Sequence, residues 1–394
     1  MNEKRTALLT VCLLGAFLLT FSLWAYLKPD DAFSQSERRK LTQKPSCTVK
    51  SIYSGRYMSD FETYAPDQFP LREQFRTLKS LTSLYLLRQR DTNGVYLAEG
   101  YVSRLEYPMQ EDSIAHAARR FDYLYDTYLS GTNCRLYLSV IPDKNAFLAS
   151  SHGYPALDYG AFTQSLREKA PYLTYLPIGD LLSLEDYYRT DLHWRQEQLT
   201  DVAARLLEGM GAEAPGTFRE ETLPTPYYGV YYGYAALPME PDTIRYLTND
   251  TLESCTVYHY ETGQTTGIYD GEKGAGRDPY EWFLSGSESL LTVENPHAAT
   301  ERELVIFRDS FASSLAPLLM EQYAKITLVD IRYLSSTTLG KYLTFTDQDV
   351  LFLDASTTTR CLIPLICKHP EKKLTIITSS ILTAADLSAC EHVS

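Results

Sequence analysis

The chain has 394 residues, of which 44% are hydrophobic and 22% are charged, and its formal net charge is -13. This composition is typical of a globular protein and excludes a disordered chain or a fibre. The acidic balance argues against nucleic acid as a partner, because a phosphate-backbone binder needs a basic face. The length permits one large domain or two smaller ones.

An apolar run near the amino end, residues 7–27, is interrupted only by three hydroxyl residues. As a helix it would be about 31 Å long, enough to cross the hydrocarbon core of a membrane. Lys4 and Arg5 precede it, which favours a cytoplasmic amino end and an exported remainder. A cleaved signal peptide is the alternative, but its apolar region is shorter and ends in a small-x-small site, which this run lacks. We expect residues 1–28 to be a cytoplasmic stub and an uncleaved single-pass anchor in the cell membrane.

The segment after the span, residues 29–50, is polar and predicts a tether to an extracytoplasmic domain over residues 51–394. Six cysteines follow the span, at positions 47, 134, 255, 361, 367 and 390. In an exported domain they can form disulfides in any of fifteen full pairings, or remain buried thiols.

Helical and strand patterns then alternate along the chain. Helical spacing begins at Pro70 and continues to Tyr85, and a short strand follows the Asn93-Gly94 turn signal. A helix is predicted over residues 111–129, a strand over 136–141 and a helix over 194–207. Residues 216–295 are rich in Gly, Pro, Tyr and Thr, and predict short strands and loops in an insertion or lid.

The last hundred residues give the clearest pattern. Strands are predicted over residues 303–307, 326–331, 350–353 and 374–377, with an amphipathic helix over 311–323. Short apolar strands that alternate with helices predict an α/β fold with a parallel sheet and flanking helices.

Ser310 lies directly after the strand over residues 303–307, where a helix is predicted to begin. Ligands of open α/β sheets bind at the carboxyl ends of strands, and a helix start there offers N–H groups that stabilise an oxyanion. Taken alone, Asp309 or Ser310 is more often a simple helix cap.

Asp191 and His193 form a second candidate element. A histidine base activates a serine nucleophile, and a carboxylate fixes the tautomer of that histidine. Two alternatives are a helix cap at Asp191 and a zinc site. Because no convincing third ligand accompanies the pair, we expect no metal and no other cofactor.

These segments resemble the bacterial DHHW proteins, which are similar to the alginate and cell-wall polysaccharide O-acetyltransferases with an SGNH-hydrolase-like fold. The resemblance rests on several short motifs along the exported chain, namely Glu37-Arg38-Arg39-Lys40-Leu41, Asp67-Gln68-Phe69-Pro70-Leu71-Arg72, Asn93-Gly94-Val95-Tyr96-Leu97, Asp191-Leu192-His193-Trp194, Tyr228-Gly229-Val230-Tyr231-Tyr232, Pro241-Asp242-Thr243-Ile244, Arg308-Asp309-Ser310-Phe311 and Val329-Asp330-Ile331-Arg332-Tyr333.

The resemblance implies a catalytic triad of Ser310, His193 and Asp191. It places Phe311, Gly286, Ser287, Arg308 and Tyr231 as residues of the oxyanion site or the substrate site. The chain departs from the family pattern at Leu192, where relatives often have His, and at Arg308, where simple SGNH esterases have Gly.

The expected function is therefore that of a serine esterase or O-acetyltransferase on acyl groups of a cell-surface polysaccharide. A transferase would need a multi-span membrane acyl exporter as partner, because a single span offers no route for an acyl donor. The alternative is a non-catalytic surface or glycan-binding protein on the same fold, since a fold does not determine a function.

Overall fold

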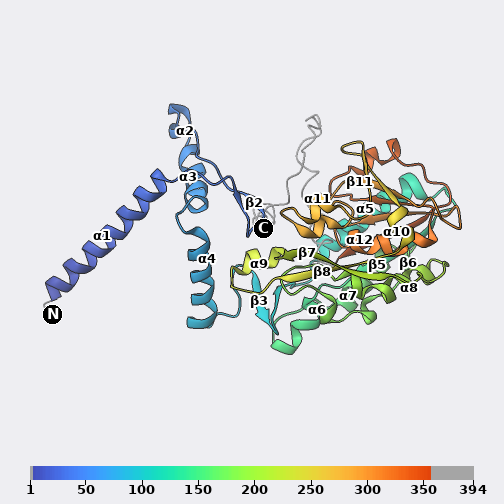
Figure 1. The fold of residues 1–394 in the computed structure, drawn as a ribbon, viewed down its shortest axis with the longest axis horizontal. Helices are drawn as coiled ribbons and strands as arrows, with labels where there is room; N and C mark the ends of the chain where they lie inside the picture. Colours follow the sequence, from blue (N-terminus) through green and yellow to red (C-terminus); the bar gives the residue numbers. More distant parts are fainter. Residues whose placement is uncertain (1–2, 356–394) are drawn as a thin grey trace.

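The computed structural model describes residues 3–355, and an eight-stranded sheet organises the globular part (Figure 1). The strand order is β10-β9-β11-β13-β12-β14-β5-β6. The bounds of these strands are β5 (Arg135–Ile141), β6 (Thr174–Tyr175), β9 (Thr256–His259), β10 (Gln264–Thr266), β11 (Leu290–Glu294), β12 (Glu303–Arg308), β13 (Lys325–Val329) and β14 (Asp349–Ala355).

Five adjacent strands of the sheet are parallel, from β13 through β12, β14 and β5 to β6. In this register Val305 lies between Thr327 on β13 and Val350 on β14. The predicted α/β fold class is confirmed. The sheet is mixed rather than purely parallel, because β11, β9 and β10 extend it in antiparallel pairs. These three strands come from the segment that the sequence predicted as an insertion.

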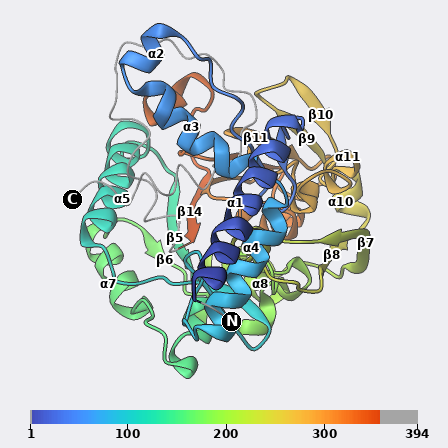
Figure 2. The same ribbon diagram turned by 90° about the vertical axis from the view of Figure 1, so that its left-hand side faces the viewer.

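Both faces of the sheet are covered by helices, which explains why the central strands are apolar throughout. Leu304 and Ile306 of β12 face one core, which includes α8 (Thr200–Gly209) and the segment after Ser310. Val305 and Phe307 face the other core, which includes α5 (Glu111–Leu124) and α7 (Tyr159–Lys169). Figure 2 shows α5 and α7 together on one side of β5, β6 and β14.

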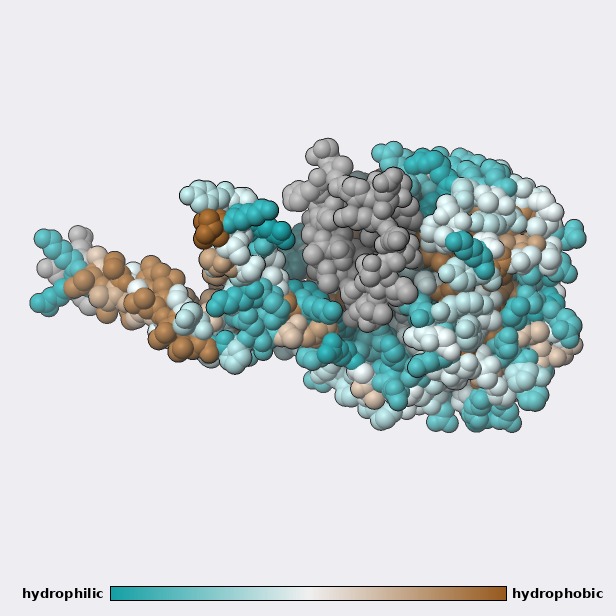
Figure 3. Space-filling view, turned by 90° about the horizontal axis from the view of Figure 1, so that it is seen from above, coloured by the Kyte–Doolittle hydropathy of each residue, from teal (hydrophilic) through white to brown (hydrophobic). Residues whose placement is uncertain are grey.

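The helix α1 (Glu3–Leu27) projects away from the globular part as an exposed apolar rod (Figures 1 and 3). It is long and apolar enough to be a candidate membrane span. Near its end, Phe21 stacks on Phe69 and lies edge-on to Phe75 of α4 (Arg72–Leu81). Two helices, α2 (Val49–Tyr53) and α3 (Arg56–Asp67), lie between the span and α4 in the chain.

Shorter elements connect these parts. Two hairpins stand outside the main sheet, β3 (Val95–Ala98) with β4 (Tyr101–Arg104), and β7 (Arg219–Tyr227) with β8 (Asp242–Thr248). The hairpin of β1 (Phe33–Ser34) and β2 (Arg39–Lys40) follows α1. The remaining short helices include α6 (Asn145–Leu148), α9 (Val230–Ala235), α10 (Asp250–Ser254) and α11 (Gly271–Gly274).

Two predicted helices differ from those observed. The helix expected from residue 194 begins only at Thr200, after a 3-10 turn over Gln196–Gln198. The helix expected over residues 311–323 is one α-helical turn, α12 (Ala312–Leu315), followed by a 3-10 helix over Ala316–Gln322. Pro317 lacks the N–H that would continue the α-helical ladder, which explains the change. The strand expected over residues 374–377 lies outside the described residues, as do three cysteines, while Cys47, Cys134 and Cys255 are free thiols.

Candidate active site

The structure brings Ser310, His193 and Asp191 together at the carboxyl end of the parallel strands. Ser310 follows β12, and His193 lies in a tight turn that precedes α8. His193 Nε2 lies 2.7 Å from Ser310 Oγ, across 117 positions of sequence. His193 Nδ1 lies 2.6 Å from Asp191 Oδ1. With the proton on Nδ1, Nε2 is the acceptor for the serine hydroxyl, which is the arrangement of a general base.

Asp191 is held by more than the imidazole. The backbone N–H of His193 donates to its Oδ1 at 3.0 Å, and that of Val230 donates to its Oδ2 at 2.7 Å. Burial by itself raises the pKa of Asp191, but the charges of His193 and Arg38 and the hydrogen bonds from His193 outweigh it, so the net pKa is lowered. Because α8 starts at Thr200, Asp191 does not cap that helix. It is instead an ionised partner of His193.

The imidazole of His193 is fixed by aromatic neighbours. The Tyr280 ring stacks on it with 3.9 Å between centroids and 11° between planes. The Phe311 ring lies 4.8 Å away on a tilted plane. Trp194 Nε1 donates to Phe311 O and to Ser314 Oγ, both at 3.0 Å, so the histidine turn is joined directly to the segment after Ser310. Only 8% of His193 is exposed.

Asp309 and Ser310 have different roles in the turn after β12. Asp309 Oδ1 accepts the Phe311 N–H at 2.9 Å, and Asp309 Oδ2 accepts the Ala355 N–H at 2.8 Å. Asp309 therefore takes the local hydrogen-bonding role that a helix cap would have. The Ser310 side chain is left to face His193 and is partly exposed, so an ester can reach it.

The other predicted site residues are differently placed. The Phe311 N–H is engaged by Asp309, so the contribution of Phe311 at the site is its ring and not an oxyanion donor. The buried Arg308 guanidinium donates to Ser313 Oγ and to the carbonyls of Gly286 and Glu288, and so supports the loop that contains Gly286. Gly286 has φ 88°, which favours glycine.

Two predicted site residues remain, and neither contacts the triad by a hydrogen bond in the part of the chain that the structure describes. Ser287 is exposed on the loop before β11. Tyr231 is 5% exposed and packs in the core around β3 and β4, with the Lys144 ammonium 5.1 Å from its ring centroid. Tyr231 is therefore a packing residue behind the site.

Sequence reasoning did not single out Tyr280 or Arg38. Tyr280 belongs to the segment that was predicted as an insertion, and nothing local predicts its stacking on His193. Arg38 belongs to the segment predicted as a tether, yet it is 5% exposed. It pairs with Asp278 at 2.7 Å, donates to Tyr228 O and contributes positive charge near Asp191. Its place in the quoted motif at residues 37–41 was the available signal.

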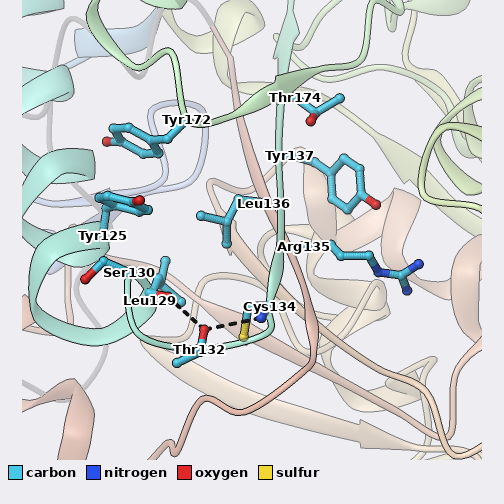
Figure 4. A pocket seen from close by; sticks show the side chains of 10 residues that line it. All are labelled: Tyr125, Leu129, Ser130, Thr132, Cys134, Arg135, Leu136, Tyr137, Tyr172 and Thr174. Atoms are coloured by element: carbon cyan, nitrogen blue, oxygen red, sulfur yellow. Dashed lines mark hydrogen bonds between the residues drawn. The ribbon is translucent and has the colours of Figure 1, made fainter.

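Two further observations concern alternative sites. Among residues 3–355, no group of three or more His, Cys, Asp or Glu side chains is arranged to hold a metal. A separate hollow of about 350 Å³ lies where β5 begins, and its lining includes Arg135, Tyr137 and Tyr172 (Figure 4). It lies at the amino end of β5, whereas the triad lies at the carboxyl ends of the strands, so the two sites are distinct.

Comparison with known proteins identifies the fold. No protein-family model matches the chain, and no curated protein matches it. A crystal structure of a DHHW family protein from Eubacterium siraeum matches with a TM-score of 0.55 at 21% identity, over 70% of this chain and 94% of that one. The structure of Bacillus cereus PatB1 with a sulfonyl adduct matches with a TM-score of 0.53 at 14% identity, over 67% of this chain and 95% of PatB1. The chain thus shares the α/β fold of these two structures, in agreement with the fold that its resemblance to the DHHW proteins implied.

Proposed function

We propose that the chain is a membrane-anchored extracytoplasmic serine esterase or O-acetyltransferase that acts on acyl groups of a cell-surface polysaccharide. The observation that carries the proposal is the continuous hydrogen-bonded series from Asp191 through His193 to the partly exposed Ser310. A lone serine after a strand is commonly a cap, but a cap has no need of an oriented histidine and a buried carboxylate.

The proposed chemistry begins when Ser310 Oγ attacks the acyl carbonyl while His193 Nε2 takes the hydroxyl proton. The C–O bond to the leaving alcohol then breaks, and His193 returns the proton to that alcohol, which leaves an acyl-serine. In the second half, water or a glycan hydroxyl attacks the acyl carbon and gives its proton to His193. The bond between the acyl carbon and Ser310 Oγ then breaks, and His193 returns the proton to Oγ, which regenerates Ser310. Hydrolysis and transfer differ only in this second acceptor.

The candidate span α1 gives the proposed location. With Lys4 and Arg5 in its first turn, the amino end stays in the cytoplasm and the globular part lies outside. Because one span provides no path for an acyl group, a transferase takes its acyl donor from a multi-span membrane exporter. Protease added to intact cells should then remove the globular part, whereas protection of the whole chain would contradict this orientation.

Covalent labelling tests the nucleophile directly. Full-length protein in its membrane should react with a sulfonyl fluoride at Ser310, and peptide mass spectrometry should locate the adduct there. The structure of PatB1 with a sulfonyl adduct is the reason for choosing this class of reagent. Ser310→Ala and His193→Ala should each abolish labelling and most turnover of a small acetyl ester, because each breaks the same series of hydrogen bonds. Ser335→Ala, on the loop after β13, is the matched control and should label normally.

An unlabelled native chain that also fails to hydrolyse acetyl esters would favour the non-catalytic glycan-binding alternative. If the native chain hydrolyses esters slowly but acetylates glycan in cells only when a membrane acyl exporter is present, the transferase form of the proposal is supported. Full acetylation in cells that lack every such exporter would contradict it.

A further inference from the structure

Lys144 is a buried lysine that the proposed chemistry does not use. It lies three residues beyond β5, and only 1% of it is exposed. Its ammonium donates to Tyr188 O at 2.8 Å, to Arg189 O at 3.3 Å and to Asp191 O at 2.6 Å. A lysine ammonium has three N–H donors, and here all three meet carbonyls of one turn. Burying a charge is costly unless it is satisfied in this way.

Asp242, the first residue of β8, holds the same turn from its other side. Its carboxylate accepts the N–H of Arg189 at 3.0 Å, the N–H of Thr190 at 2.8 Å and the hydroxyl of Thr190 at 2.5 Å. Lys144 therefore binds the carbonyls of the turn, and Asp242 binds its amides. The turn that is fixed between these two charges is the one that contains Asp191.

We infer that Lys144 is a positioning residue whose protonated ammonium fixes the backbone of Asp191 and thereby the alignment of His193 with Ser310. The inference rests on the proposed function, because it assigns Lys144 a role in that acyl transfer. Lys144 acts through the backbone of the turn and not on the reacting atoms. A displacement of about 1 Å in a catalytic group can cost about 100-fold in rate, so a turn held at three carbonyls has kinetic consequences.

If the Lys144 ammonium holds the turn, the catalytic rate depends on the protonation of Lys144 at alkaline pH. Burial lowers the pKa of Lys144 to about 8, against the opposing charges of Asp191, Asp242 and Asp143. The groups that face the ammonium are these three carboxyls and the rings of Tyr101 and Tyr231. Burial also raises the pKa of Asp143 to about 7, while burial raises the pKa values of both tyrosines above 10, so the Lys144→Arg profile is needed to assign a change near pH 8 to Lys144 rather than to Asp143. The neutral amine keeps two donors and turns a lone pair toward the third carbonyl.

The test uses the full-length protein in lipid nanodiscs and a small acetyl ester, with spontaneous hydrolysis subtracted. In the native protein, kcat should fall as pH rises through about 8. Lys144→Met should lower kcat by at least about 10-fold at neutral pH, with a smaller change in KM, because it misplaces the base without removing binding contacts. Lys144→Arg keeps a permanent charge, so the fall near pH 8 should be absent from its profile.

Amide hydrogen exchange over residues 188–193 supplies a readout independent of activity, and Lys144→Met should accelerate it. Arg302→Met is the matched control, since Arg302 also donates to two carbonyls, those of Met210 and Gly211, at the other end of the sheet. It should change stability but neither the exchange of the turn nor the pH profile.

The outcomes separate the inference from the proposed function. If Ser310→Ala keeps full turnover, the proposed function fails whatever Lys144 does. If Ser310→Ala is inactive while Lys144→Met keeps kcat within about twofold and leaves exchange unchanged, the inference is overturned. Should Lys144→Met fail to fold, the native and Lys144→Arg profiles decide, because identical profiles through pH 8 would overturn the inference.

Discussion

Replacing Asp191 by Asn tests whether the carboxylate sets the tautomer of His193. In the structure, two N–H groups of His193 point at Oδ1 and the Val230 N–H points at Oδ2. Asparagine has one acceptor oxygen and one donor NH2, so it can accept hydrogen bonds either from His193 or from Val230, but not from both. If its NH2 faces Val230, a buried N–H loses its partner, at a cost of about 1–3 kcal/mol.

If the NH2 of the new residue faces the imidazole instead, Nδ1 must accept and Nε2 must carry the hydrogen. His193 then cannot accept the proton of Ser310. We expect kcat for acetyl-ester hydrolysis to fall by about 1,000- to 10,000-fold, the size of loss that a wrong histidine tautomer causes in serine hydrolases. The free energy of unfolding should fall by only about 1–3 kcal/mol, so the fold should persist.

Ester hydrolysis and thermal unfolding should be measured on the same preparation. Asp349→Asn is the control, because Asp349 is also a buried carboxylate that accepts hydrogen bonds, from Arg302 and Tyr323, but at the amino end of β14. It should lose stability and keep activity. If Asp191→Asn keeps kcat within about tenfold of the native value while folded, His193 does not depend on Asp191 for its tautomer and the reasoning is refuted.

Three further predictions follow from buried contacts. Gly229→Ala should lower the free energy of unfolding by about 1–3 kcal/mol and reduce ester turnover, because the added Cβ would overlap Thr190 O and Asp191 Cβ. Circular dichroism melts measure the stability and steady-state kinetics measure the turnover. A variant with native stability and turnover would contradict the prediction. Trp194→Phe should lower the free energy of unfolding by about 2 kcal/mol and reduce kcat with a smaller change in KM, since it removes the indole donor to Phe311 O and leaves a small void. A variant as active as the native protein would contradict a positioning role for this hydrogen bond. Burial raises the pKa of Asp143 from 3.8 to about 7, so the folded state binds this proton more tightly and stability falls as pH rises from about 4 to about 7. Asp143→Asn should lack that fall in denaturant titrations, and a parallel pH dependence in both proteins would refute the assignment.

Much of the fold and the three central residues could be predicted from local sequence. The apolar stretches at β5, β12, β13 and β14 predicted buried strands because both faces of a parallel sheet are covered. Ser310 was recognisable after a strand, and the Asp191-x-His193 step was recognisable by its spacing. The structure places these two segments in hydrogen-bond contact, 117 positions apart, as the predicted triad requires.

Some errors were local in cause and others were not. Pro317 already excludes a continuous α-helix after Ser310, so the 3-10 segment was readable from the sequence. The late start of α8 could not be predicted from the sequence, because Asp191 contacts His193 and Val230 instead of capping a helix.

The sequence by itself determined the apolar amino-terminal helix and the alternation of strands and helices, since each depends on a short window of residues. Its resemblance to the DHHW proteins pointed to Ser310, His193 and Asp191 as candidate site residues. Tertiary structure alone decided that β11, β9 and β10 extend the sheet antiparallel, that Tyr280 stacks on His193, and that Lys144 and Asp242 hold the turn of Asp191. It also decided that the Phe311 N–H is taken by Asp309. These contacts join segments that are remote in sequence, or depend on the direction of one N–H bond, and neither property is encoded in local periodicity.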